Sequence, residues 1–162
     1  MRSRKLSIAY VHYGAQSGVT GQVARALGTR GHEVRLVEAT GDLEPRHPVT
    51  GRLRPLPGVA LTLAAAAARF GVGRSALEHR WYTSYAFDHH GRDAGVALRA
   101  LRPAPDVVLQ NGALFGPGDP APYPSVLLLD HPRALAEATP GWPSAGVASA
   151  RARVWSRRRT EG

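Results

Sequence analysis

Residues 8–37 constrain the fold more than any other stretch, because they read as strand, turn, helix and strand in that order. Apolar residues 8–11 predict a buried strand, and after a turn apolar side chains recur at helical spacing over residues 19–27. Gly31 stands where the residue after a helix adopts a left-handed conformation, and residues 34–37 predict a second strand. A strand, a helix and a strand in about thirty residues make a βαβ unit, with parallel strands and a right-handed crossover.

Ligands of parallel α/β sheets bind beyond the carboxyl ends of the strands, so residues 12–21 are the first place to look for a site. A dinucleotide site needs G-x-G-x-x-G and an acidic residue at the end of the second strand. Glu38 fits the acidic position, but Gly14, Gly18 and Gly21 give G-x-x-x-G-x-x-G. The backbone N–H groups that open the helix would also suit an anion such as a phosphate. A plain strand-to-helix turn has the same spacing.

The rest of the chain continues the alternation of helices and strands. A proline-rich run at residues 39–57 predicts a long loop of the kind that serves as a binding loop or lid, and residues 58–70 predict a helix. Residues 93–102 have helical periodicity, residues 106–110 read as a strand, and residues 125–129 read as a strand that is apolar on both faces. We therefore predict an α/β fold, a Rossmann-like three-layer αβα sandwich with a mainly parallel sheet.

Polar residues follow the predicted strands on the side where ligands gather. Asn111 and Gly112 follow the strand at 106–110, and Asp130 and His131 follow the strand at 125–129. His12 stands at the end of the first strand. A carboxylate such as Asp130 could act at the site or orient an imidazole, although neighbours on a chain do not ordinarily face each other.

Two other clusters carry weaker signals. His89 and His90, after Asp88, fall in a predicted loop, where adjacent histidines seldom converge on one ion, so we expect no metal site. An aromatic-basic cluster could stack on a ligand or pack against the core, and packing is the favoured interpretation. Its members are Arg80, Trp81, Tyr82 and Tyr85.

Composition narrows the class of protein. The chain has 162 residues, of which 43% are hydrophobic, enough for one domain with a sizeable core. It has no cysteine, which excludes a disulfide framework and a thiolate zinc site. Neither the pattern of a signal peptide nor an apolar run long enough to span a bilayer is present in the sequence. We expect a cytoplasmic protein.

Positive charge is concentrated at the end of the sequence. The formal net charge is +9, and residues 151–162 carry +4 of it through five arginines and one glutamate. Such a tail could neutralise phosphates of nucleic acid or anionic lipid, although a solvated, disordered end is the favoured interpretation. We therefore predict one domain over residues 1–143 and a basic tail over residues 144–162.

Three stretches in a fixed order resemble a known family. SGVTGQVARALGTRGHEVRLV has a glycine-bearing turn and a helix that ends in R-G-H-E-V. LRPAPDVVLQNGALF has a helix end, a P-D-V-V strand and a loop, and YPSVLLLDHPRALAE has a strand that ends at an aspartate before a helix. Together they resemble the N-terminal domain of glycosyltransferase family 4, over roughly residues 6–143.

The resemblance implies the acceptor-side half of a GT-B glycosyltransferase, which moves a sugar from a nucleotide-sugar to an acceptor without a catalytic metal or a further cofactor. It implies His131, then Asp130, as the catalytic candidates. The implied partners are the two substrates and a donor-binding domain, with peripheral membrane contact also allowed and no specific nucleic acid. The implied substrate-binding residues are Gly14, Ser17, Gly18, Asn111 and Gly112.

The donor domain of that family would follow residue 143, and residues 144–162 lack its pattern. We expect a truncated or frameshifted product or one half of a split enzyme, with no turnover by this chain alone. Two rivals stay open: an NAD(P)-dependent oxidoreductase, and a non-enzymatic basic module that binds through its arginine tail.

Overall fold

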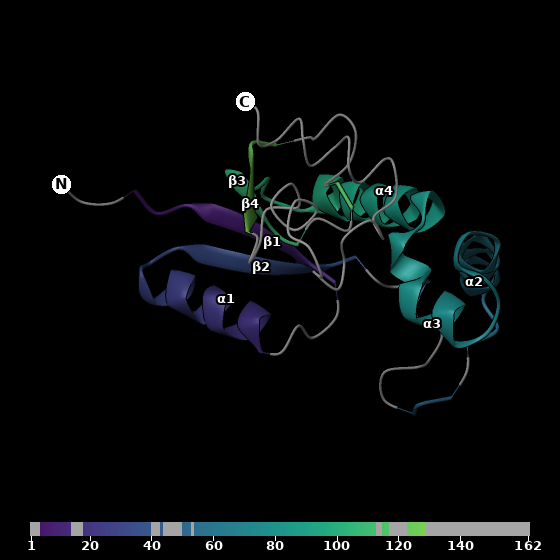
Figure 1. Ribbon diagram of the computed structural model, residues 1–162. Helices are drawn as coiled ribbons and strands as arrows, with labels where there is room; N and C mark the ends of the chain where they lie inside the picture. Colours follow the sequence, from purple (N-terminus) through teal and green to yellow (C-terminus); the bar gives the residue numbers. More distant parts are fainter. Residues whose placement is uncertain are drawn as a thin grey trace, which may run out of the picture. The chain divides into compact units, whose positions relative to one another are not determined.

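The computed structural model describes residues 4–13, 18–39, 43, 50–52, 54–112, 115–116 and 123–128. In chain order its elements are β1 (Ser7–His12), α1 (Val19–Thr29), β2 (Glu33–Glu38), α2 (Pro57–Phe70), α3 (Arg74–His79), the 3-10 helix η2 (Arg80–Tyr82), α4 (Ser84–Ala100), β3 (Val107–Asn111) and β4 (Ser125–Leu128) (Figure 1). Among the described residues, those up to Ala39 and from His90 onward form one compact unit, and those between them form a second.

The first unit is built on a parallel sheet with the strand order β2-β1-β3-β4. All three strand pairs are parallel, and β1 lies between β2 and β3. The middle of β1 is fully buried, with Ala9, Tyr10 and Val11 each 0% exposed. The predicted α/β, Rossmann-like fold is confirmed.

Helix α1 occupies the place that the sequence pattern predicts. Gly18 precedes it with φ of 78°, and Gly31 follows it with φ of 88°, so both glycines adopt the left-handed conformation that other residues avoid. The amide of Gly31 donates to the carbonyl of Gly28 at 2.9 Å, which closes the helix before β2 begins. The βαβ prediction for this stretch is therefore confirmed.

The two faces of the sheet carry different helices. Tyr10 points toward α1, since its phenol interacts with Thr20 of that helix. Gln110 of β3 is paired with Val11 and so points to the opposite face, where its side chain bonds to the carbonyl of Phe115. The ring of Phe115 contacts His90 of α4. From His90 onward, α4 therefore covers the face opposite α1.

Helix α4 begins at Ser84, nine residues before the predicted start at Asp93, so the prediction of a loop at His89 and His90 is wrong. Thr83 caps the helix, because its hydroxyl accepts the amide of Ala86 at 3.1 Å. The buried stripe of the helix includes His90, which is 2% exposed, and this polar residue interrupts the apolar periodicity.

Smaller differences concern α2 and β4. Helix α2 begins at Pro57 rather than Gly58, with the proline in the first turn, where its missing N–H is not needed. β4 is apolar on both faces, a pattern typical of central strands, but within the described residues it lies at the end of the strand order and its Val126 is 55% exposed. Most of the loop predicted at residues 39–57 lies outside the described residues. No helix in the described part combines the length and apolarity needed to cross a bilayer.

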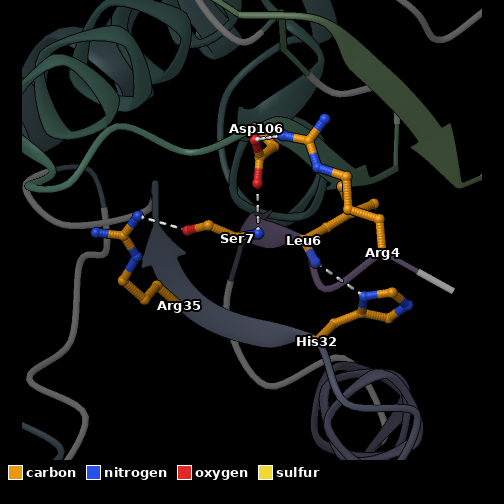
Figure 2. A network of polar contacts seen from close by, with 6 residues as sticks. All are labelled: Arg4, Leu6, Ser7, His32, Arg35 and Asp106. Carbon is orange, nitrogen blue, oxygen red and sulfur yellow. Dashed lines mark hydrogen bonds and ion pairs between the residues drawn. The ribbon is translucent and has the colours of Figure 1, made fainter. Parts of the chain in front are cut away.

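A polar network fixes the amino ends of the strands (Figure 2). One oxygen of Asp106 accepts the amide of Ser7 at 2.8 Å, and the other accepts Arg4 at 3.2 Å. Arg35 donates to the hydroxyl of Ser7 at 2.9 Å and to the carbonyl of Pro103 at 2.7 Å. The strands are therefore tied together at the edge remote from the predicted site.

The second unit contains the aromatic-basic cluster. The guanidinium of Arg80 lies 4.4 Å from the ring centre of Trp81, and the ring of Tyr82 lies 6.1 Å from that of His79. Arg80 also donates to the carbonyl of Leu77 at 2.7 Å. Trp81 and Tyr82 are half-buried, in agreement with side chains that pack against the protein rather than project fully into solvent.

Candidate functional site at the carboxyl ends of the strands

The strand order defines where a ligand is expected. From β1 the chain crosses through α1 to β2 on one side, and β3 lies on the other side of β1. The direction of winding therefore reverses between β1 and β3, and ligands of open parallel sheets bind at such a switch point, beyond the carboxyl ends of the strands.

Three predicted site residues lie at this edge. Gly18 opens α1, which follows β1, Asn111 is the last residue of β3, and Gly112 follows it with φ of 80°. The N-cap residue of α1 is Gly18, which has no side chain to accept the first backbone amides of the helix. The other predicted site residues lie outside the described residues, and their placement stays a prediction: Gly14, Ser17, Asp130 and His131.

Tyr13 lies against Gly112 on the α4 face of the switch point. A Cβ atom on Gly112 would come within 2.8 Å of Cε1 of Tyr13, so the ring occupies the space that any other residue would need. The edge of Tyr13 meets Phe115, with ring centres 6.2 Å apart. Phe115 lies 5.6 Å from the ring of His90, whose Nδ1 bonds to the carbonyl of Ala39. An aromatic chain therefore links the ends of β1, β2 and β3.

Gln110 holds the segment after β3 in place. Its Nε2 donates to the carbonyl of Phe115 at 2.5 Å and to that of Gly112 at 3.0 Å. Two carbonyl acceptors fix which end of the amide carries hydrogen. Within the described residues, Oε1 of Gln110 is buried and accepts no hydrogen bond. Gln110 thus stabilises the turn that begins at Gly112.

The α1 face carries a different set of groups. His12 and Glu38 are register partners at the last positions of β1 and β2. Val11 pairs with Gln110, so the next position of β3, Asn111, is the neighbour of His12 on the other side. Residues paired across parallel strands share a face, and a carboxylate, an imidazole and an amide therefore form a row across three strands. We call Glu38, His12 and Asn111 the polar row.

Tyr10 lies behind the polar row. Its ring centre is 6.3 Å from that of His12, two residues further along β1. Burial raises the pKa of the Tyr10 phenol, and the hydroxyl of Thr20 lowers it to a lesser extent. The phenol is therefore neutral at physiological pH. Within the described residues, no group of three or more histidine, aspartate or glutamate side chains is arranged to hold a metal ion.

Sequence reasoning missed the aromatic side of this edge. Tyr13 follows the predicted first strand directly, and that position was the available signal for it. Phe115 and His90 carry no such signal, because the first lies in a glycine-rich loop and the second falls in a helix that the periodicity does not reveal.

No protein-family model, no curated protein and no solved structure matches the chain. The expected boundary between residues 1–143 and 144–162 lies outside the described residues, as does the basic tail. Support for a function therefore comes from the geometry of the strand ends and from the resemblance of the three stretches.

Proposed function

We propose that this chain supplies the acceptor-side half of a glycosyltransferase of the GT-B type. The observation that supports the proposal most is the strand order β2-β1-β3-β4, with Asn111, Gly112 and the Gly18 turn at its switch point. The three stretches that resemble glycosyltransferase family 4 contain these same residues. In that arrangement, the carboxyl edge of the sheet forms one wall of the cleft.

The proposed chemistry divides between two walls. A donor-binding domain holds the nucleotide-sugar and stabilises the diphosphate that leaves. This chain holds the acceptor so that a hydroxyl of the acceptor faces the anomeric carbon of the sugar. Asp130 and His131 are the proposed residues nearest the reacting sugar, on the basis of the resemblance and of their position after β4 in the sequence.

Ligand-observed NMR tests the proposal. The ligands are methyl glucoside, methyl mannoside, methyl galactoside and myo-inositol as acceptor probes, with UDP-glucose, GDP-mannose and NADH for comparison. We expect saturable binding of at least one acceptor probe, weakened by His131→Ala. His32→Ala is the matched control, since His32 accepts the amide of Leu6 at the opposite edge of the sheet. Binding of NADH alone, or of none of these compounds, would refute the proposal.

One observation favours the alternative of a dinucleotide site. Glu38 is the last residue of β2, where an acidic residue of a dinucleotide-binding fold receives the ribose hydroxyls. The glycine spacing argues against it, because Gly14 and Gly18 are separated by three residues instead of one. Submicromolar binding of NADH or NADPH would support the dinucleotide site instead of the glycosyltransferase proposal.

A further inference from the structure

We propose that the polar row of Glu38, His12 and Asn111 binds two neighbouring hydroxyl groups of a ligand, a vicinal diol. The inference rests on the proposed function, because it names the chemical group of the acceptor that the same edge recognises. It adds two residues, His12 and Glu38, that the glycosyltransferase resemblance does not assign. Sugars, cyclic polyols and the ribose of nucleosides all carry vicinal diols.

The register of the strands brings the three side chains together. His12 and Glu38 are paired across β1 and β2, and Asn111 is the next position after the pair of Val11 and Gln110 across β1 and β3. Neighbouring strands lie about 4.8 Å apart, so the row extends over about 10 Å. A ring with hydroxyl groups on adjacent carbons can reach two members of such a row at once.

The chemistry of the row suits a neutral ligand. A carboxylate accepts hydrogen bonds, and an amide both donates and accepts them. A neutral imidazole donates at one nitrogen and accepts at the other. A hydroxyl group likewise donates and accepts, so it can exchange hydrogen bonds with each of these three kinds of side chain. The carboxylate of Glu38 would repel a phosphate at this place. The row is therefore suited to a polyol rather than to an anion.

The environment of the row also fits this assignment. Asn111 is 6% exposed, so its amide is held in a fixed place, whereas Glu38 is exposed and His12 is half-buried. Tyr10 closes the row from behind. A ligand can therefore approach from the carboxyl edge and meet a buried amide at one end of the row and a solvated carboxylate at the other.

The experiment compares pairs of probes that differ by one hydroxyl. Binding of methyl glucoside and its 3-deoxy analogue, which has no vicinal diol, and of adenosine and 2′-deoxyadenosine, is followed through the NMR signals of the Ala39 and Gly112 amides. The variants are Glu38→Gln and His12→Gln. Glu33→Gln is the matched control, since Glu33 is an exposed glutamate at the other end of β2. Because Glu38 lies on the surface, we expect the Glu38→Gln variant to fold as the unmodified protein does.

We expect the diol of at least one pair to bind about tenfold more tightly than its deoxy analogue, because a hydrogen bond to a charged group is involved. Glu38→Gln and His12→Gln should remove most of that preference, and Glu33→Gln should leave it unchanged. If adenosine alone shows the preference, the row stands and the glycosyltransferase proposal falls. If no probe shows a preference for the diol that depends on Glu38 and His12, or no probe binds, the row is refuted.

Discussion

Gly112 is restricted to glycine by two separate constraints, its backbone angle and the aromatic ring beside it. Its φ is 80°, and the nearest atom to a Cβ at this position is Cε1 of Tyr13 at 2.8 Å. Gly31 has a similar φ of 88° but open space around it. The comparison of these two glycines therefore separates the cost of the backbone angle from the cost of displacing Tyr13.

Substitution of the two glycines by alanine makes this comparison. Gly31→Ala should lower the free energy of unfolding by about 1 kcal/mol, the cost of a left-handed conformation. Gly112→Ala should lower the free energy of unfolding by about 1 kcal/mol more than Gly31→Ala does, because the ring of Tyr13 must also move. Hydrogen exchange of the β1 and β3 amides measures both values, and Tyr13→Ala should remove the difference. Equal losses for the two glycines would contradict the contact with Tyr13.

At the scale of residues, the sequence predicts only part of the site. Strand ends are readable because apolar runs stop there, and this is how Asn111 and Gly112 are found. Tyr13 and Phe115 meet only after the strands have paired, since they are about a hundred residues apart in the sequence. The pairing of His12 with Glu38 likewise depends on register, which periodicity does not fix.

At the scale of elements, the amino ends of the strands are stabilised by side chains with different degrees of burial (Figure 2). The side chain of Arg35 is 21% exposed and bonds to Ser7 and to the segment before β3. The side chain of Arg4 is 81% exposed and pairs with Asp106 at 3.2 Å. Exposed ion pairs contribute little to stability, whereas bonds held in a less solvated place contribute more.

We therefore expect different outcomes for the two arginines. Arg35→Ala should lower the free energy of unfolding by about 1–2 kcal/mol, because the hydroxyl of half-buried Ser7 and the carbonyl of Pro103 lose a charged donor. Arg4→Ala should change it by less than about 0.5 kcal/mol. Urea unfolding, followed by hydrogen exchange of the same strands, gives both numbers. A larger loss for Arg4→Ala would show that the exposed pair with Asp106 holds this edge instead.

The elements themselves are predicted well where one pattern dominates. The prediction for the stretch from β1 to β2 is correct because its helix is amphipathic and is bounded by glycines in left-handed conformations. Helix α4 is predicted only in its second half. Its first half has a polar residue, His90, at a buried position, and its cap at Thr83 lies among aromatic residues in the sequence. Tertiary contacts override the pattern there.

At the scale of the whole molecule, we propose that the polar ends of several strands gather at one edge of the sheet. The structure places the ends of β1, β2 and β3 there, and the position of His131 at the same edge stays a prediction. Because the chain has no cysteine, spin labels can be attached at introduced cysteines alone.

Double electron–electron resonance on two labelled pairs measures whether residue 131 lies at this edge. One pair combines Glu38→Cys with His131→Cys, and the other combines Glu33→Cys with His131→Cys. Glu33 and Glu38 are the two ends of β2, which lie about 16 Å apart at about 3.3 Å per residue. We predict a clearly shorter distance from position 131 to position 38. A shorter distance to position 33 would place His131 at the opposite edge and contradict the proposed cleft.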